Sequence, residues 1–360
     1  MMTDEHLLIL ILALLLDRII GDPDWLWQRV PHPVVLFGRA ISFFDRHFNA
    51  KELPGLTRRR NGVMSIVALL FGAAISYAER QLNPASLTGS QRRMNGIAAI
   101  LALLLLAVAA GFVFNRFFAL FGPVGILLET GLVAIFLAQK SLADHVGEVS
   151  KALRSEGLDG GRRAVSRIVG RDPETLDEPG VCRAAIESLA ENFSDGVVAP
   201  ALWYAVFGLP GLFVYKMLNT ADSMIGHKSE TYIDFGWAAA RLDDIANWPA
   251  ARLSILLIAA GALAKKGISA LGNTIRVAVR DGGLHRSPNS GRPEAAMAGA
   301  LDIQLAGPRV YGGQVVREPM INGSGRDIAT VSDVEAGISI FYSACTMLTL
   351  VAFIAFLLLL

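Results

Sequence analysis

Residues 183–196 read Arg183-Ala-Ala-Ile-Glu187-Ser-Leu-Ala-Glu191-Asn192-Phe-Ser-Asp195-Gly196, and they pass directly into apolar sequence that begins Val197-Val-Ala-Pro200. Glu187, Glu191 and Asp195 are spaced four residues apart, so on a helix their side chains point the same way. The apolar side chains fall on the opposite face, namely Ala185, Ile186, Leu189, Ala190 and Phe193. The run therefore predicts an amphipathic helix that leads directly into an apolar segment.

Two interpretations of this helix remain open from its spacing. Hard cations such as Mg²⁺ take oxygen ligands, often one or two carboxylates together with substrate phosphates, and this face would supply the carboxylates. The alternative is an ordinary amphipathic helix with a solvated acidic face, which is the usual explanation of such a pattern. The spacing by itself favours the second interpretation.

The composition indicates a membrane protein. Hydrophobic residues make up 53% of the 360 residues and charged residues only 18%, and the mean hydropathy is +0.45. These values lie outside the range of ordinary soluble domains and inside that of helical membrane proteins. The net charge is +1, so we expect no nucleic-acid partner. The two cysteines, Cys182 and Cys345, lie far apart in sequence without a metal-ligand spacing and predict neither a disulfide framework nor a redox site.

Apolar stretches predict several membrane helices. Four are long with almost no charge, between Arg60 and Glu79, between Arg93 and Arg116, from Phe117 to Gln139, and from Ala336 to Leu360. Glu129 interrupts the third, and a carboxylate at that depth usually faces the interior of a bundle.

Three further stretches are ambiguous. Leu7–Leu16, continued through Ile20, is a partial span or an interfacial helix, and Ile245–Ala264 is a marginal span that contains Arg252. Gly196–Tyr215 is interrupted by glycine and proline, so a broken or re-entrant helix is as plausible as a plain span. The prediction is an all-α, polytopic helical membrane protein with helical and loop-rich polar segments at the membrane surface. We expect one integral membrane domain over residues 1–360, with motif-bearing polar segments at 17–60, 141–195, 216–248 and 265–335.

A second polar block carries more functional side chains than solubility requires. It runs Lys216-Met-Leu-Asn219-Thr220-Ala-Asp222-Ser223-Met-Ile-Gly226-His227-Lys228, and Arg241-Leu-Asp243-Asp244-Ile-Ala-Asn247 follows. Helical spacing places Asn219 near Asp222 and Ser223, Arg241 near Asp244, and Asp243 near Asn247. Such pairs either ligate Mg²⁺ or satisfy one another, and for each single pair the second outcome is more common.

A third block contains glycine and arginine in a loop-like segment. It reads Arg280-Asp281-Gly282-Gly283-Leu-His285-Arg286-Ser287-Pro288-Asn289-Ser290-Gly291-Arg292. Glycines let backbone N–H groups approach an anion, and arginines supply charge-assisted donors that suit phosphate. The block is either a phosphate loop or a flexible basic loop, since it lacks the Walker-type pattern that would decide the question.

Taken together, these motifs resemble the CobD/CbiB family of membrane adenosylcobinamide-phosphate synthases. The resemblance rests on Glu187–Pro200, Asn219–Lys228, Asp234–Asp244 and Arg280–Asn289, and on Gly21-Asp22-Pro23, Pro31-His32-Pro33 and Gly170-Arg171-Asp172. It follows the chain in order over nearly its whole length, and several long motifs together are far more specific than one short signature.

This resemblance implies a late step of cobalamin synthesis. In that step ATP and Mg²⁺ support amide formation between a propionate carboxylate of adenosylcobyric acid and (R)-1-amino-2-propanol or its O-phosphate. It also implies a multi-pass protein of the cytoplasmic (inner) membrane, in contact with membrane lipid and open to association with other corrinoid-pathway enzymes. An unactivated carboxylate needs a leaving group, and phosphoryl transfer needs charge stabilisation of the kind these blocks offer.

The motif positions predict the site residues. For Mg²⁺ with the nucleotide we expect Glu187, Glu191, Asp195, Asp222 and Asp244. For catalysis or contact with developing charge we expect His227, Lys228, His285 and Arg286, with His227 or His285 as the base that frees the amine. For substrate or phosphate binding we expect Asn192, Asn219, Ser223, Arg241, Gly282, Gly283, Asn289 and Arg292.

Two other function classes remain alternatives. Asn219/Asp222 and Asp243/Asp244 loosely match aspartate-rich metal motifs, which would suit a Mg²⁺-dependent membrane transferase acting on a diphosphate. The interrupted segment Gly196–Tyr215 and Glu129 would suit a non-enzymatic transporter or membrane sensor. The clustering of glycine, arginine and carboxylate motifs in polar segments argues against both.

Overall fold

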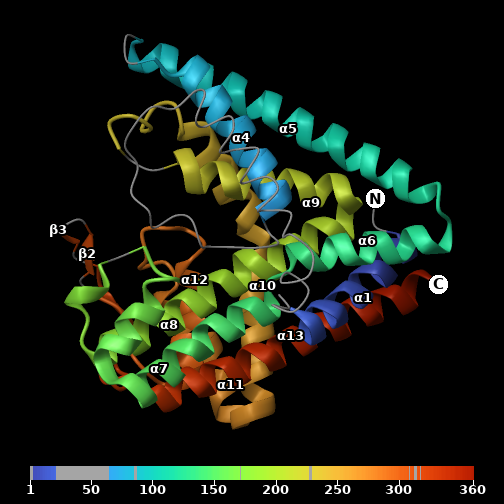
Figure 1. Cartoon of the computed structure of the whole chain (residues 1–360). Coiled ribbons are helices and arrows are strands. Elements are labelled where there is room, and N and C mark those ends of the chain that lie inside the picture. Colours follow the sequence, from blue (N-terminus) through green and yellow to red (C-terminus); the bar gives the residue numbers. More distant parts are fainter. Residues whose placement is uncertain are drawn as a thin grey trace.

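A computed structural model describes residues 3–21, 65–84, 87–170, 172–226, 229–307, 309–311, 314–316 and 318–360. Within these ranges the chain is almost entirely helical, as the composition predicts (Figure 1). Several sequence motifs lie outside the described residues, among them Asp22-Pro23, Pro31–Pro33 and Arg171. Two of the predicted catalytic residues, His227 and Lys228, also lie outside them.

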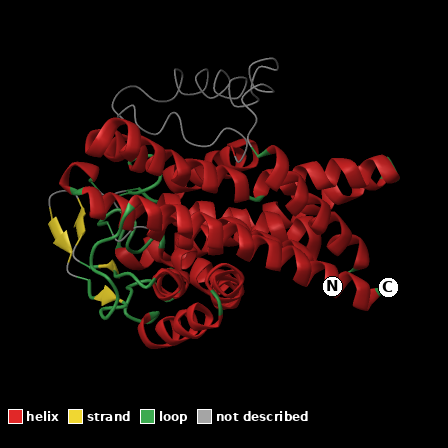
Figure 2. Cartoon of the chain, turned by 90° about the horizontal axis from the view of Figure 1, so that it is seen from below, coloured by secondary structure: helices red, strands yellow, loops and turns green. Residues whose placement is uncertain are grey.

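The helices, in chain order, are α1 (Asp4–Ile20), α4 (Ser65–Leu82), α5 (Gly89–Ala119), α6 (Pro123–Phe136), α7 (Gln139–Val165), α8 (Glu178–Phe193), α9 (Ala199–Ile225), α10 (Trp237–Lys266), α11 (Ile268–Asp281), α12 (Gly291–Leu301) and α13 (Val331–Leu359). A 3₁₀ turn, Pro173–Thr175, precedes α8, and a π turn, Ser194–Val198, joins α8 to α9. Two short antiparallel pairs complete the secondary structure, β1 (Leu305–Ala306) with β4 (Met320–Ile321) and β2 (Arg309–Tyr311) with β3 (Gln314–Val316). In Figure 2 these strands and most loops gather at the end of the bundle away from the two termini.

Five helical segments of the described chain are long and apolar enough to cross a membrane. They are Gly89–Ala119, Pro123–Val165, Glu178–Ile225, Trp237–Lys266 and Val331–Leu359. Gly89–Ala119 contains the span expected near 93–116, and Val331–Leu359 covers nearly all of the one expected at 336–360. The span expected at 117–139 begins too early, because α5 continues to Ala119 and a turn at 120–122 separates it from Pro123–Val165. The other two segments contain the ambiguous stretches 196–215 and 245–264.

The expected span between Arg60 and Glu79 corresponds to α4, which is not among the five. The structure describes α4 only from Ser65, and its last turn holds Glu79 and Arg80, which shortens its apolar part. Leu7–Ile20 forms the single helix α1, which packs against α6 and α13.

The middle of the acidic helix α8 is buried. Residues Ala184 to Ala190 are all buried, and Glu187 itself is only 4% exposed, because α7, α12 and α13 pack around this part of the helix. A fully solvated acidic face is therefore wrong, although Glu191 is half-buried and Asn192 is exposed at the end of the helix. Asp177 caps its first turn by accepting a hydrogen bond from Gly180 N at 2.8 Å, as the sequence Asp177-Glu178-Pro179 predicts.

The apolar segment after α8 is a broken helix. The π turn interrupts the helical hydrogen bonding at 194–198, and Gly208 adopts φ 62°, ψ −151° inside α9 just before Pro210. α5 approaches α9 closely at this kink, where a Cβ on Gly111 would lie 2.4 Å from Pro210 Cα. The glycine and proline pattern thus marks a real interruption.

Glu129 faces the bundle interior, as its position in an apolar stretch predicts. It is 5% exposed, and the Tyr204 hydroxyl donates to its Oε1 at 2.7 Å. The hydrogen bond joins α6 to α9 and satisfies a carboxyl group that would otherwise be isolated among apolar side chains.

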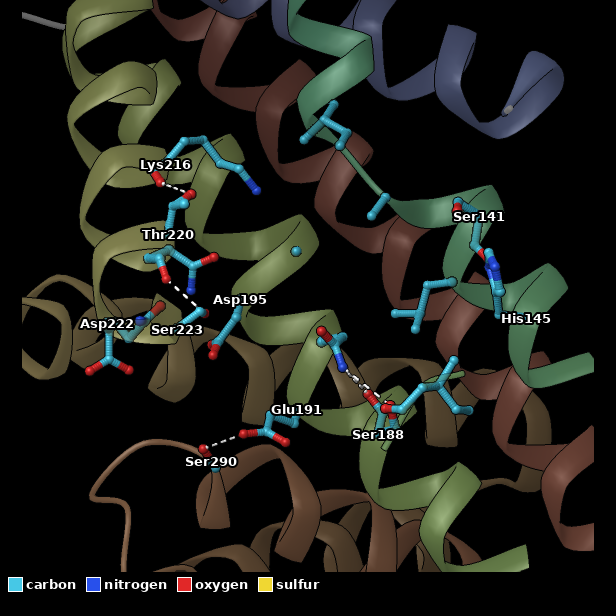
Figure 3. Close-up of a pocket in the computed structure, with 18 of the residues that line it drawn as sticks. Ser141, His145, Ser188, Glu191, Asp195, Lys216, Thr220, Asp222, Ser223 and Ser290 are labelled. Atoms are coloured by element: carbon cyan, nitrogen blue, oxygen red, sulfur yellow. Dashed lines mark hydrogen bonds between the residues drawn. The ribbon is translucent and has the colours of Figure 1, made fainter. Parts of the chain in front are cut away.

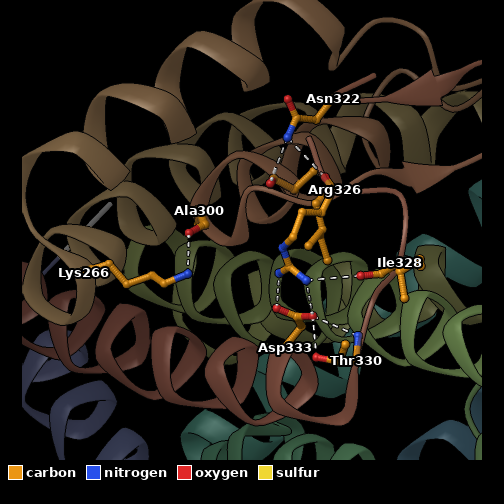
Figure 4. Close-up of polar contacts among 9 residues, drawn as sticks. Lys266, Ala300, Asn322, Arg326, Ile328, Thr330 and Asp333 are labelled. Carbon is orange, nitrogen blue, oxygen red and sulfur yellow. Dashed lines mark hydrogen bonds and ion pairs between the residues drawn. The ribbon is translucent and has the colours of Figure 1, made fainter. Parts of the chain in front are cut away.

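The segment between α12 and α13 is fixed to the bundle by polar contacts (Figure 4). Arg326 donates to both carboxylate oxygens of Asp333 at 2.6 and 3.3 Å, and Thr330 N donates to the same carboxylate at 2.8 Å. Asn322 Nδ2 reaches the carbonyl of Ile303 at 3.2 Å. These contacts hold the strand end of the bundle against the first turn of α13.

Candidate active site

A large cavity lies where α8, α9 and α10 meet the loop that follows α11. Its volume is about 1120 Å³, at or above the upper end of ordinary small-molecule sites, which run to roughly 1,000 Å³. Part of its wall is apolar and comes from α1, α6 and the start of α7, through Leu16, Ile20, Gly131, Ala134, Ile135, Leu137, Ala138 and Leu142. The opposite wall is strongly polar.

Five carboxylates contribute to the polar wall, and each comes from a motif region. They are Glu191, Asp195, Asp222, Asp243 and Asp244. Figure 3 shows Glu191, Asp195 and Asp222 on the neighbouring segments α8, the π turn and α9. The π turn contains one more residue than a turn of α-helix. Asp195 lies in this turn, so its direction relative to Glu191 is not the one that α-helical spacing predicts.

A buried tyrosine joins two of the motif segments. The Tyr215 hydroxyl contacts Asp195 O at 2.7 Å and Asn247 Oδ1 at 2.9 Å, and Asn247 Nδ2 donates to Asp243 Oδ2 at 2.9 Å. The pairing of Asp243 with Asn247 confirms the contact that helical spacing predicts. The hydrogen bonds fix the π turn against α10 and hold the two aspartates on one side of the cavity.

Lys216 is the lysine of the polar wall. It is 4% exposed, lines the cavity beside Asp195 and interacts electrostatically with that carboxylate (Figure 3). Lys216 stands at the start of the second polar block but is not among the site residues that the sequence predicts. Its place on the cavity follows from the packing of α9 against the neighbouring helices.

The loop 285–290 covers one side of the polar wall. Ser287 N donates to His285 Nδ1 at 3.0 Å, and the amides of Asn289 and Ser290 donate to Ser287 Oγ at 3.3 and 3.2 Å. The Ser290 hydroxyl then donates to Glu191 Oε1 at 2.9 Å. The loop is therefore a folded turn attached to α8.

Most predicted site residues that the structure describes lie at this cavity. Those that line it are Glu191, Asn192, Asp195, Asn219, Asp222, Ser223, Asp244, His285, Arg286 and Asn289. Those that do not are Glu187, Arg241, Gly282, Gly283 and Arg292.

Glu187 is directed away from the cavity. Its Oε1 accepts a hydrogen bond from Ala306 N at 2.7 Å, so the carboxylate holds the backbone of β1 against α8. The expectation that it lies on the cavity beside Glu191 is not met. Glu187 lies about 6 Å before Glu191 along the helix axis, where the neighbouring segment is β1 rather than the loop 285–290. Arg241 is exposed on the first turns of α10, also away from the cavity lining.

His145 is a cavity residue that sequence reasoning missed. Its Nδ1 lies 2.6 Å from the carbonyl oxygen of Ser141, one helical turn earlier (Figure 3). A carbonyl only accepts, so Nδ1 carries the proton and Nε2 of the neutral ring keeps a lone pair. His285 has the opposite arrangement, since its Nδ1 accepts from Ser287 N and its proton therefore lies on Nε2.

The carboxylate oxygens of this wall suit a hard cation that completes its coordination with substrate oxygens. Asp195 Oδ1 and Asp243 Oδ1 are buried, and neither accepts a hydrogen bond from the residues that the structure describes. Within the same residues, no three His, Cys, Asp or Glu side chains converge closely enough to hold an ion alone. This arrangement fits Mg²⁺ bound through one or two carboxylates with waters and substrate phosphate, rather than an all-protein cage.

Comparison with known proteins gives consistent matches over most of the chain. Residues 10–77 and 67–341 match the CobD/Cbib protein family. A Sinorhizobium protein named cobalamin biosynthesis protein CobD is 61% identical over 349 residues, covering 96% of this chain and 97% of that protein. Proteins of the same name from Brucella suis and Rhodobacter capsulatus are 49% and 39% identical, over 95% of this chain and 94% and 95% of theirs. No solved structure matches the chain. With a family match across nearly its full length, the chain belongs to the CobD/CbiB protein family.

Proposed function

We propose that this protein acts in cobalamin biosynthesis as an ATP-dependent ligase. The reaction joins a propionate carboxylate of adenosylcobyric acid to the amine of (R)-1-amino-2-propanol or its O-phosphate, and gives adenosylcobinamide or its phosphate. The proposal rests on the family, whose named members above are cobalamin biosynthesis proteins, and on the chemistry of the cavity.

The observation that carries the proposal is a large cavity with one apolar wall and one polar wall. A volume of about 1120 Å³ suits a large ligand with a nucleotide, and one wall is apolar while the other holds carboxylates, Lys216, His285 and Arg286. A corrinoid is a large, mainly apolar ring edged by polar side chains, so such a cavity matches it in both size and polarity.

Amide formation needs an activated carboxylate. ATP supplies the leaving group, as a phosphate or an adenylate, and the corrinoid carboxylate gives up one oxygen with it when the new C–N bond forms. Glu191, Asp195, Asp222, Asp243 and Asp244 are the groups that would hold Mg²⁺, which neutralises phosphate charge when bound. Arg286 and Lys216 supply positive charge on the same wall for the departing phosphate.

The attacking amine must lose a proton. Because Nδ1 of His145 faces the Ser141 carbonyl, Nε2 is the ring nitrogen available to accept that proton. His285 carries its proton on Nε2 and is suited to donate a hydrogen bond to phosphate or to developing negative charge. His227 and Lys228 stay predictions for the same chemistry, since they lie outside the described residues.

The proposed location is the cytoplasmic membrane, where the five apolar helical segments would cross the bilayer. Association with other corrinoid-pathway enzymes belongs to the same proposal.

The test is ligation by the purified protein in lipid nanodiscs. Adenosylcobyric acid, ATP and Mg²⁺ are supplied with aminopropanol or its phosphate in parallel, and corrinoid products are identified by mass spectrometry. We expect amide formation that falls at least about a hundredfold in Glu191→Gln and Arg286→Ala. Arg276→Ala, an exposed position on α11, serves as the matched control.

Undiminished rates in both cavity variants would remove these residues from the mechanism. Release of diphosphate from a lipid-like donor without amide formation would replace the ligase with a membrane transferase. Uptake of corrinoid into proteoliposomes without ATP-dependent chemistry would instead indicate a transporter.

A further inference from the structure

Arg252 occupies an unusual place on α10. The charged residues Arg241, Asp243 and Asp244 lie in the first part of the helix, and the stretch from Leu253 to Ala264 holds none, so Arg252 lies at the border of the two parts. Its guanidinium carbon is 4.5 Å from the centroid of the Trp248 ring, and its Nη1 donates to Trp248 O at 3.1 Å. A charged side chain in a membrane helix is costly to insert and generally has a defined partner.

That partner is the loop 285–290. Arg252 Nη1 donates to Asn289 Oδ1 at 2.8 Å, and Nη2 lies 3.5 Å from Pro288 O. Arg252 itself is absent from the cavity lining. Any influence of this arginine on the cavity therefore acts through the loop.

Asn289 also contacts α10 through the nitrogen of its side-chain amide. Its Nδ2 donates to Asp244 O at 2.8 Å, and the side chain is only 4% exposed. Both ends of the amide are thus engaged by α10, one by a side chain and one by the backbone. These contacts favour a positioning role for Asn289 over the phosphate contact that its motif suggests.

Several hydrogen bonds of the loop set its shape. The bonds among His285, Ser287, Asn289 and Ser290 are internal to the turn. Asn289 and Ser290 also attach the turn to the helices that bear the carboxylates, Asn289 to α10 and Ser290 to α8. Arg286 adds an ion pair with Glu318 at 3.7 Å. Because the internal bonds do not involve α8 or α10, weakening the attachment at Asn289 should displace the turn more than it unfolds it.

We propose that Arg252 is a positioning residue, which acts through Asn289 to hold the loop 285–290 so that His285 and Arg286 lie on the cavity. The proposal deepens the ligase function and rests on it, because the consequence is a correctly placed site for phosphate. Lysine would not replace this arginine fully, since a single ammonium cannot stack on Trp248 and present a planar set of donors to Asn289 and Pro288.

The experiment combines kinetics with a measure of loop position. Arg252→Met, Arg252→Lys, Asn289→Ala and the double variant Arg252→Met/Asn289→Ala are compared with the parent for kcat and for KM of ATP. Arg276→Met is the control, because Arg276 is exposed and lies outside the cavity. Loop mobility is read from a nitroxide on Leu284→Cys, a site that is 43% exposed, while both native cysteines are buried and escape labelling. Melting temperatures in detergent identify variants that fail to fold.

We expect Arg252→Met and Asn289→Ala each to raise KM for ATP about tenfold or more, the range for loss of a hydrogen bond to a charged group. Both should increase nitroxide mobility at a nearly unchanged melting temperature, and Arg252→Lys should restore part of each effect. The double variant should be no worse than Asn289→Ala, because both changes break one connection.

Three results would overturn the proposal: additive effects in the double variant, unchanged KM with unchanged nitroxide mobility in a folded Arg252→Met protein, or a melting-temperature loss that accounts for the entire effect. If the parent protein forms no amide, the ligase function fails by itself. The nitroxide measurements then still decide whether Arg252 and Asn289 hold the loop.

Discussion

The Ser290 hydroxyl donates a hydrogen bond to Glu191 Oε1 at 2.9 Å, which connects two motifs that are 99 residues apart in sequence. One belongs to the carboxylate helix α8 and the other to the loop after α11. The bond orients a carboxylate of the polar wall and ties the loop to it (Figure 3). The motifs thus form one site rather than three independent ones.

Removing this bond should weaken the site without unfolding the protein. We expect Ser290→Ala to lower kcat/KM about tenfold, since a hydrogen bond to a carboxylate contributes roughly 1.5–3 kcal/mol. Steady-state kinetics beside Ser155→Ala, an exposed serine on α7, measure the effect. Parent-like kinetics in Ser290→Ala would show that Glu191 is oriented by other contacts.

Lys216 should matter for stability as well as activity. Lys216→Met removes a buried positive charge that interacts electrostatically with the Asp195 carboxylate, and a buried charge that loses a compensating charge destabilises the folded state. We expect a lower melting temperature and loss of ligation. Lys216→Met/Asp195→Asn should recover stability but not activity. A single variant as stable as the parent would contradict the charge-balancing role.

The contact between Tyr204 and Glu129 should be structural. Tyr204→Phe removes the donor to Glu129 and should destabilise the protein by about 1–3 kcal/mol. Neither residue lines the cavity, so kcat/KM of the folded fraction should stay unchanged. Thermal unfolding beside Tyr77→Phe, which is 69% exposed, provides the comparison. Lost activity at unchanged stability would point to an ion or proton route through Glu129.

The apolar wall should limit substrate size at Gly131. A Cβ there would meet nothing within 4 Å, so a larger side chain enters the cavity without disturbing the helix packing. We expect Gly131→Leu to lower kcat/KM for the corrinoid at least about tenfold and Gly131→Ala to change it little. Gly272→Leu, with equally open surroundings on α11, is the control. Equal activity in both leucine variants would place the corrinoid elsewhere.

Low pH should destabilise the protein partly because the Asp281 carboxylate becomes protonated. Hydrogen bonds from Arg280 at 2.7 Å, and one from Asn322 N at 2.8 Å, lower the pKa of the Asp281 carboxyl below its usual value. A carboxyl group with a lowered pKa in the folded state stabilises the fold above its unfolded pKa, near 3.9, and loses that contribution as pH falls through the folded value. Melting temperatures of the parent and Asp281→Asn should therefore differ at pH 7 and converge below about pH 4. A constant difference over that range would refute the assignment.

Much of the fold could be predicted from the chain alone because membrane helices follow from local apolar length. The stretch from Arg93 to Arg116 and the C-terminal stretch from Ala336 lack charges, and both lie within long apolar helices. The stretch between Arg60 and Glu79 is helical from Ser65 onward as α4, and its first residues lie outside the described part of the chain. The interruption of the helix within 196–215 could also be predicted from sequence, because glycine and proline change the backbone conformation of the segment that contains them.

The sequence by itself also determined the chemistry of the candidate site, since its motifs supplied Glu191, Asp195, Asp222, Asp244, His285 and Arg286. Only the tertiary structure decided how they meet. On α8, Glu187 accepts a hydrogen bond from Ala306 and Glu191 accepts one from Ser290, although both belong to the same four-residue spacing. Lys216 and His145 join the cavity for the same reason: the direction of a side chain depends on which neighbours pack around its helix, and helical periodicity does not contain that information.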